Sequence, residues 1–121
     1  MSSPEVSSSA GTKFDRGKRL WSLFRLSDFE PAIRVGEFGA QKYDRYNWQR
    51  VEDPSRYQDA LLRHLCAHQD GVLTDEESGL PVLAHVLWNA VVLCWFDRQK
   101  RPAAYERAAR DPSERLHPLK P

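Results

Sequence analysis

Apolar side chains recur at helical spacing in three segments of the chain, and no segment alternates as a half-buried strand does. The first segment covers about residues 28–44. Asp28 precedes it as a candidate N-cap, and Pro31 suits the opening turn, where a missing N–H leaves no bond unmade. The side of this helix that we expect to be buried carries Phe29, Ile33 and Phe38.

The second segment has the clearest boundaries, with Asp53 and Pro54 at its start and Gly71 at its end. An aspartate cap followed by proline is typical of a helix start, and glycine adopts the left-handed conformation that closes a helix. We therefore predict a helix over about residues 54–70. Helical spacing puts one set of side chains on a single face, namely Tyr57, Leu61, His64, Leu65 and His68.

The third segment, about residues 80–96, is apolar on nearly every side, which predicts the central helix. A short helix is expected from Pro102, whereas the stretch RYNWQRVED lacks a period and is expected to be a loop. The predicted fold is all-α, a compact bundle of three main helices plus a short C-terminal helix. The predicted organisation is a disordered tail over 1–12, a helical domain over 13–101, and a short helix with a C-terminal arm over 102–121.

Composition narrows the class of protein. The chain has 121 residues, which is too short for a multidomain enzyme. Of these residues 40% are hydrophobic, which is enough for one modest core. The longest apolar run is interrupted by His85 and Asn89 and is shorter than the ~20 residues that a bilayer requires. Cys66 and Cys94 lack partners at C-x-x-C spacing, and the N-terminus lacks the apolar region of a signal peptide. We expect a cytoplasmic protein with no membrane partner.

Charge is distributed unevenly although the net charge is only +1. Residues 27–96 contain six Lys/Arg against eleven Asp/Glu, and both ends of the chain are basic. An acidic centre suits a divalent cation, whereas basic ends suit nucleotide phosphates or simply remain solvated. These basic ends could also associate with nucleic acid, and such binding would weaken steeply with salt. We expect no specific nucleic-acid binding.

Two polar residues on the apolar third helix require an explanation. His85 and Asn89 are four residues apart and share one face. Leaving such groups buried and unpaired costs roughly 1–3 kcal/mol each, so a neighbouring helix or a ligand must satisfy them. On the second helix, His64 and His68 have the spacing of two metal ligands, without the glutamate of a metalloprotease, and His64 beside Arg63 is the better candidate.

The acidic run Asp75-Glu76-Glu77 comes just before the third helix. It is either a solvated loop or a site for Mg²⁺, which takes one or two carboxylates together with water and phosphate oxygens. Other segments contain candidate phosphate-binding cations, and aromatic or amide groups suited to a base: Lys18, Lys42, Tyr43, Asn47 and Trp48. No Walker or dinucleotide-binding glycine motif is present.

Four blocks, KFDRGKRLWSL, EFGAQKYDRYNW, ALLRHLCAHQDG and DEESGLPVLAHVLWNAVVL, resemble in order and spacing the phage-associated dATP/dGTP diphosphohydrolase N-terminal domain family. The resemblance covers about residues 12–96. It implies a relation to the all-α MazG-like nucleotide pyrophosphatases, which use Mg²⁺ to cleave nucleoside triphosphates to monophosphate and pyrophosphate. The MazG-type E-x-x-E and E-x-x-D motifs are absent from this chain.

The resemblance also implies roles for individual residues. The catalytic group would be His64, His85 and Asn89, and the metal ligands would be Asp75 and Glu77. Purine deoxynucleotides would be bound by Lys18, Lys42, Tyr43, Asn47, Trp48 and Arg63.

Two positions depart from the family pattern, because Val72 stands where a glutamate is common and Val82 where a histidine is common. Each loss removes a potential ligand or proton carrier. The activity that the resemblance implies is Mg²⁺-dependent hydrolysis of dATP and dGTP. The two losses support an alternative, a catalytically inactive protein that binds or sequesters nucleotides. In either case we expect the protein in the host cytoplasm if a phage encodes it.

The number of predicted helices bears on assembly. Two helices cannot enclose an apolar third helix completely, and Leu83, Leu87, Val91 and Trp95 are candidates to line the uncovered face. We expect a homodimer to bury this face. The alternative is a cover made by residues 102–121.

Overall fold

The computed structural model describes residues 17–108, and within this range it contains helices and no strand. The main helices are α1 (Glu30–Lys42), α2 (Ser55–Gln69) and α3 (Val82–Lys100), followed by the short α4 (Pro102–Ala108). Three 3₁₀ turns, η1 (Trp21–Leu23), η2 (Leu26–Asp28) and η3 (Asn47–Arg50), complete the fold. The predicted all-α class is confirmed. The predicted tail over 1–12 and the arm after residue 108 lie outside the described residues.

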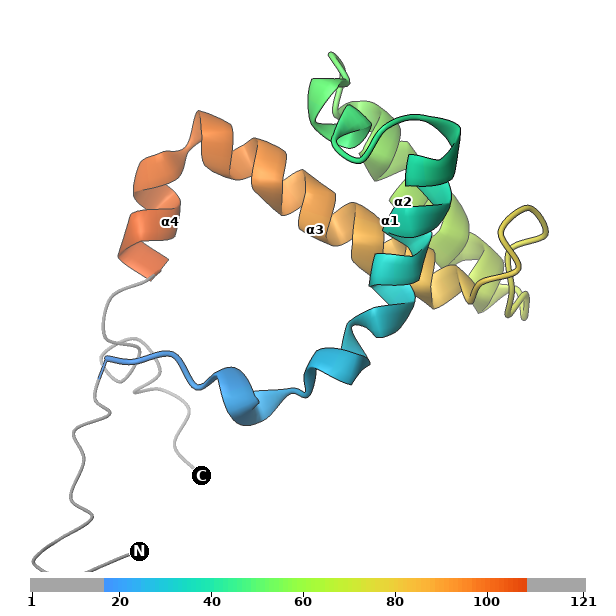
Figure 1. Cartoon of the computed structure of the whole chain (residues 1–121), viewed down its shortest axis with the longest axis horizontal. Coiled ribbons are helices and arrows are strands. Elements are labelled where there is room, and N and C mark those ends of the chain that lie inside the picture. Colours follow the sequence, from blue (N-terminus) through green and yellow to red (C-terminus); the bar gives the residue numbers. More distant parts are fainter. Residues whose placement is uncertain (1–16, 109–121) are drawn as a thin grey trace, which may run out of the picture.

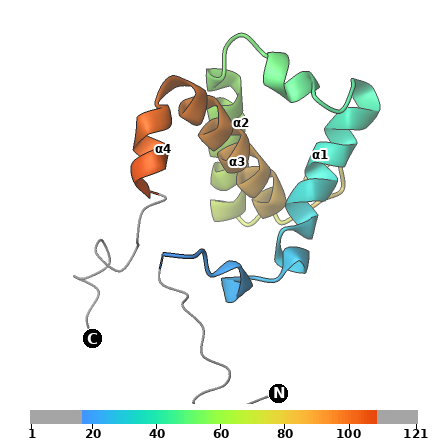
Figure 2. The same cartoon turned by 60° about the vertical axis from the view of Figure 1, so that its left-hand side comes forward.

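Helix α3 is the centre of the fold, as predicted. Both α1 and α2 pack against it, and α4 turns back from its C-terminal end (Figures 1 and 2). It also carries most of the buried side chains, namely Val82, Ala84, His85, Asn89 and Val92. No helix among residues 17–108 is both long enough and apolar enough to cross a membrane.

The boundaries of α2 agree with the sequence to within one residue. The Asp53 carboxylate accepts hydrogen bonds from the Ser55 backbone N–H at 3.1 Å and from the Ser55 hydroxyl at 2.8 Å. Gly71 adopts a φ of 91° after the helix, a conformation that costs little only for glycine. Helix α3 extends beyond the predicted residue 96, because Asp97 pairs with Arg101 one turn later and accepts a hydrogen bond from the Tyr105 hydroxyl at 2.7 Å.

The prediction for α1 is wrong in two details. Asp28 does not cap the helix, since its carboxylate accepts the Arg25 backbone N–H at 2.8 Å inside η2. On the expected apolar side, Phe29 and Ile33 are 39% and 54% exposed and only Phe38 is half-buried, whereas Ala32 and Val35 are buried. Small side chains face α3 because the two helices approach closely there, with Gly36 placed against the Trp88 ring.

The stretch expected to be a loop contains η3, which inserts Trp48 into an aromatic cluster. The Trp48 ring meets three rings of α3 edge to face, with centroid distances of 6.0 Å to Trp88, 5.1 Å to Trp95 and 6.4 Å to Phe96. Such pairs add stability beyond the burial of their area. The connection between α1 and α2 therefore packs against α3 through Trp48.

Residues 20–26 before α1 form an arm of apolar side chains that the rest of the described chain does not cover. The exposed fraction is 84% for Trp21 and 90% for Leu26. Figure 2 shows this arm, in blue, running from the start of α1 below the α2 and α3 pair toward the side of α4.

Candidate functional site

A tight loop between α2 and α3 brings a carboxylate to the two helices. An isolated bridge joins Thr74 to Pro81, and the Asp75 backbone N–H donates to the Leu80 carbonyl at 2.8 Å. Gly79 turns the chain with a φ of 71°. The Ser78 backbone N–H donates to the Asp75 carboxylate at 2.8 Å, which holds that side chain in place.

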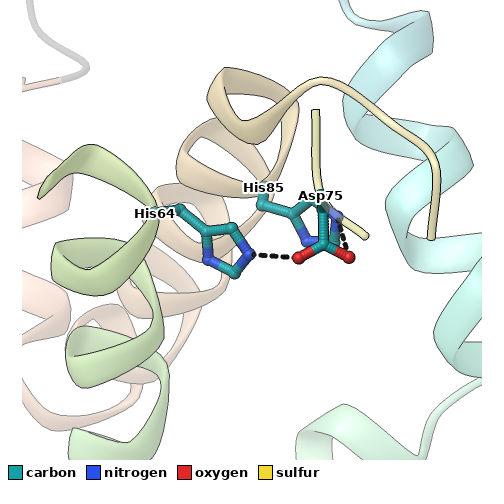
Figure 3. Close-up of side chains that lie close together, drawn as sticks. All are labelled: His64, Asp75 and His85. Carbon is teal, nitrogen blue, oxygen red and sulfur yellow. Dashed lines mark hydrogen bonds and ion pairs between the residues drawn. The ribbon is translucent and has the colours of Figure 1, made fainter. Parts of the chain in front are cut away.

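The Asp75 carboxylate faces the Nε2 atoms of a histidine of α2 and a histidine of α3 (Figure 3). His64 Nε2 is 3.3 Å from Asp75 Oδ1, and His85 Nε2 is 3.9 Å from Asp75 Oδ2. The two imidazole rings stack in parallel, with centroids 4.4 Å apart and an interplanar angle of 1°. We call these three residues the His64–Asp75–His85 cluster.

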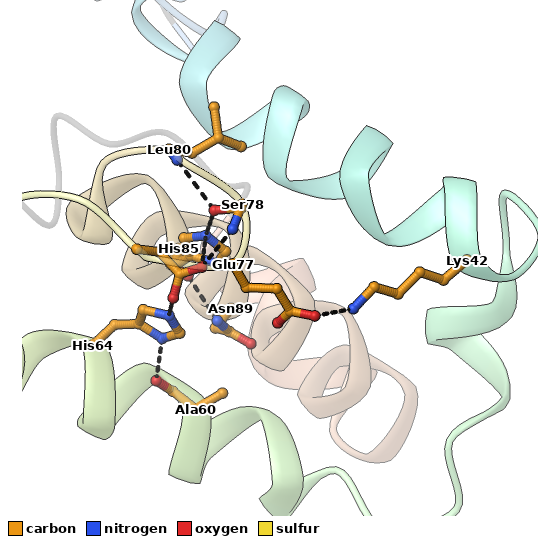
Figure 4. Close-up of polar contacts among 9 residues, drawn as sticks. Lys42, Ala60, His64, Glu77, Ser78, Leu80, His85 and Asn89 are labelled. Atoms are coloured by element: carbon orange, nitrogen blue, oxygen red, sulfur yellow. Dashed lines mark hydrogen bonds and ion pairs between the residues drawn. The ribbon is translucent and has the colours of Figure 1, made fainter.

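Neighbouring groups orient the cluster (Figure 4). His64 Nδ1 bonds to the Ala60 carbonyl at 2.8 Å. The Ser78 hydroxyl lies 2.7 Å from His85 Nε2 and accepts the Leu80 backbone N–H at 3.1 Å. The partner of His85 therefore comes from the loop, whereas we expected a neighbouring helix or a ligand.

Asn89, the second polar residue of α3, is satisfied within its own helix. Its side-chain amide donates to the His85 carbonyl at 2.7 Å. His68 is half-buried one turn beyond His64 and lies outside the cluster.

Electrostatics favour a charged Asp75 beside a neutral His85. Burial alone would raise the pKa of the Asp75 carboxyl, but hydrogen bonds from Ser78 and His64 outweigh it and hold the pKa below its ordinary value. Burial, and then the neighbouring His64, lower the pKa of the His85 imidazole.

The main cavity, about 790 Å³ in volume, lies between α1, η3, α2 and α3. Its size is within the range of small-molecule sites. Eight of the residues singled out from the sequence line it, although they come from separate parts of the chain: Lys42, Tyr43, Asn47, Arg63, His64, Glu77, His85 and Asn89.

The remaining candidates lie elsewhere. Trp48 belongs to the aromatic cluster behind Trp88, which itself lines the main cavity. Asp75 lines the adjacent smaller cavity. Lys18 is exposed in the segment before η1 and is not among the residues that line either cavity.

Lys42 and Glu77 form an ion pair from the end of α1 to the loop, across the main cavity. The hydrogen bond with Glu77 raises the pKa of the Lys42 ammonium group. Both side chains are largely exposed, at 44% for Lys42 and 68% for Glu77, so either can change partner at little cost.

The sequence did not predict two residues that belong to the site. Arg56 lines the main cavity, and its spacing of seven residues from Arg63 would have put it on the same helix face. Ser78 contacts both Asp75 and His85, and no periodicity points to it because it lies in a loop.

The smaller cavity, about 430 Å³ in volume, lies beside the cluster and is lined by His64 and Asp75 together with Val72 and Val82. The two positions that depart from the family pattern therefore face the same space. Val82 is buried at 2% exposure and Val72 is 45% exposed. Both put methyl groups beside His64 and Asp75.

Comparisons with known proteins agree with the resemblance. A dATP/dGTP diphosphohydrolase of Salmonella phage PMBT28 is 35% identical over 97 residues, which are 80% of this chain and 33% of the relative. The chain thus spans about a third of the length of that curated relative. No solved structure matches the chain. The profile of the family described as dATP/dGTP diphosphohydrolase, N-terminal, matches residues 8–105, and the chain belongs to this family.

Proposed function

We propose that this chain hydrolyses the purine deoxynucleoside triphosphates dATP and dGTP to monophosphate and pyrophosphate in the presence of Mg²⁺. The observation that carries the proposal is the main cavity, in which three cations, two amides, two phenols and two histidines converge from separate segments of the chain. The name of the phage relative supports the choice of substrate.

The cations of the main cavity would bind the triphosphate. Lys42 extends from the end of α1, while Arg56 and Arg63 lie two turns apart on α2. An incoming phosphate would replace Glu77 as the partner of Lys42. Tyr43 and Asn47, which follow Lys42 in the chain and also line the main cavity, would contact the base and sugar. Trp48 would support this part of the cavity through its contact with Trp88.

The carboxylates of the loop suit a Mg²⁺ ion that arrives with the nucleotide. Mg²⁺ takes oxygen ligands and keeps several waters, and Asp75 and Glu77 supply such oxygens. Glu77 becomes available when Lys42 turns to a phosphate, because its other surroundings are largely solvent. The chemistry supplied by bound Mg²⁺ is neutralisation of phosphate charge.

The histidines would act on water. In the proposed reaction the oxygen of a water molecule bonds to the α-phosphorus, the bond from that phosphorus to the bridging oxygen breaks, and pyrophosphate leaves. A neutral imidazole, His64 or His85, would orient the water and accept its proton. The lowered pKa of His85 keeps it in the neutral form that this role requires.

The test is product analysis. Purified protein is incubated with each of the four deoxynucleoside triphosphates and Mg²⁺, and monophosphate and pyrophosphate are quantified. We expect both products in equal amounts from dATP and dGTP and little from dCTP and dTTP. Release of orthophosphate or tripolyphosphate, or no turnover in any reaction, would contradict the proposal.

The smaller cavity favours a second candidate, a protein that sequesters nucleotides without turnover. Val72 and Val82 leave His64 and Asp75 without further ionisable neighbours from these two positions. If this candidate is right, wild-type protein binds dATP or dGTP and releases no product, whereas Val72→Glu combined with Val82→His gains turnover. Turnover by the wild type would exclude it.

We also propose that the chain forms a homodimer. Leu83 and Val91 of α3 are 45% and 53% exposed, and the apolar arm over residues 20–26 is uncovered as well. A second copy would bury such surfaces. Light scattering should give about 28 kDa, twice the 14.0 kDa of one chain, and a 14.0 kDa species at micromolar concentration would contradict the proposal.

A further inference from the structure

The hydrogen-bonding pattern of His64 leaves an unsatisfied contact in the cluster. The Ala60 carbonyl can only accept, so the hydrogen of a neutral His64 ring must be on Nδ1, which bonds to that carbonyl at 2.8 Å. In this neutral form His64 Nε2 offers only a lone pair to Asp75 Oδ1 at 3.3 Å, and a hydrogen bond between them forms only when the ring carries a second proton. Two acceptors at this distance repel each other unless a proton or a metal cation lies between them.

His85 adds a third donor atom to the same point. One potential ligand atom from each of His64, Asp75 and His85 lies within 4.8 Å of the others. The side chains of His64 and His85 are only 18% and 11% exposed, and that of Asp75 is 24% exposed. A cation held there would be largely shielded from water.

We propose that the His64–Asp75–His85 cluster binds a divalent transition metal, with Zn²⁺ as the best-matched ion. Two imidazole nitrogens and one carboxylate are ligands that Zn²⁺ accepts readily, whereas Mg²⁺ prefers oxygen. Ligand atoms around a four-coordinate zinc are about 3.3 Å apart. The His64 to Asp75 separation already has this value, whereas the His85 ring, now stacked parallel to that of His64, must turn so that both lone pairs meet at one ion.

The surroundings of the cluster match those of a metal site. A metal-binding histidine commonly donates its second ring N–H to a carbonyl, as His64 does to Ala60, and ligating carboxylates are themselves hydrogen-bonded, as Asp75 is by Ser78. The Ser78 hydroxyl lies 2.7 Å from His85 Nε2 and would leave that atom if it ligated the metal. Ser78→Ala should therefore retain the metal.

Three protein ligands leave one position of a tetrahedral ion open. His64 and His85 both line the main cavity, so this position faces the proposed nucleotide site. In the metal-bound protein His64 and His85 would hold the cation, which would supply Lewis-acid activation of water, in place of accepting a proton themselves. This last step rests on the proposed function, whereas the metal site rests on the three side chains alone.

The test is titration of the full chain, stripped of metal with a chelator, with Zn²⁺ and separately with Mg²⁺ in a calorimeter. The exposed thiols of Cys66 and Cys94 are removed by Cys→Ser substitution so that they do not bind the ion. We expect one Zn²⁺ per chain and no comparable heat with Mg²⁺. Asp75→Asn and His64→Gln should each weaken Zn²⁺ binding by more than about 100-fold, the upper end of what losing an outer partner costs.

His68→Gln is the matched control, because His68 lies on the same helix one turn from His64 and outside the cluster. It should bind Zn²⁺ as the wild type does. Circular dichroism establishes that each variant is folded, and the visible absorption of bound Co²⁺ reports nitrogen and oxygen ligands independently of activity. Equal Zn²⁺ affinity in wild type and Asp75→Asn, or no binding by the wild type, would overturn the inference.

The two proposals fail separately. Zn²⁺ binding without any nucleotide hydrolysis would keep the metal site and remove the proposed function. Hydrolysis that persists at full rate in zinc-free protein with Mg²⁺ would keep the proposed function, and together with absent Zn²⁺ binding it would remove the metal site.

Discussion

The two halves of α3 support different kinds of structure. The first half carries His85 and Asn89, buried polar residues that line the main cavity, and His85 also lies beside the Asp75 carboxylate. The second half carries Trp95 and Phe96, which pack with η3 and α2 into an aromatic cluster. One helix thus presents a polar site at one end and a stabilising core at the other. Substitutions in the first half should affect chemistry, and those in the second half should affect stability.

The largest expected effect is a loss of hydrolysis on substitution of the loop carboxylates beside the first half of α3. Asp75→Asn and Glu77→Gln should each lower the rate of dATP hydrolysis by orders of magnitude, because both remove a charge that the proposed reaction needs. The thermal midpoint should stay similar for Glu77→Gln, whose ion pair with Lys42 is exposed. Product formation and thermal melting measure the two effects. Unchanged rates in both variants would remove the loop from the mechanism.

The next effect belongs to the aromatic end. Trp95→Ala removes ring contacts with Trp48 at 5.1 Å and with Phe96 at 5.0 Å. We expect the free energy of unfolding to fall by about 2–4 kcal/mol, somewhat below the cost at a fully buried tryptophan, and Zn²⁺ affinity to stay within a few-fold. Denaturant unfolding and calorimetry measure these quantities. A Trp95→Ala variant that is as stable as the wild type but no longer binds Zn²⁺ would contradict the assignment of stability to the second half of α3.

A third test lies where α1 meets the middle of α3. A Cβ added at Gly36 would come within 2.6 Å of the Trp88 ring, whereas one at Gly39 meets nothing within 4 Å. Gly36→Ala should therefore destabilise the fold by about 1–3 kcal/mol. Gly39→Ala is the matched control and should stabilise it by up to about 1 kcal/mol, as alanine does inside a helix. Equal denaturation midpoints for the two variants would contradict the close helix contact.

The smallest effect is a pH dependence at the junction of α3 and α4. The hydrogen bond to Asp97 raises the pKa of the Tyr105 hydroxyl to about 12, above its ordinary value of 10.0. The unfolded chain therefore loses this proton first, so the stabilisation is complete below pH 10 and is lost as the pH rises towards 12. Tyr105→Phe should flatten the decline of the thermal midpoint in this range. Identical pH profiles for wild type and variant would exclude the contribution.

Much of the architecture follows from the sequence. The start and end of α2 were predictable because Asp53, Pro54 and Gly71 act on the backbone within one turn of themselves. The central position of α3 followed from apolar residues on all its sides. His85 was identified as a site candidate because a buried imidazole needs a partner wherever the chain places it.

Other features were decided only by the tertiary structure. Asp75 and Glu77 are two residues apart and chemically alike, yet one joins the histidines and the other pairs with Lys42. Similarly, Trp48 packs against α3 from a segment without periodicity, and Ala32 and Val35 are buried in place of larger neighbours. Helix boundaries depend on groups a few bonds apart, which local sequence records. Which carboxylate meets which imidazole depends on the path of the loop bridged from Thr74 to Pro81, and which face of α1 is buried depends on the space that Trp88 leaves.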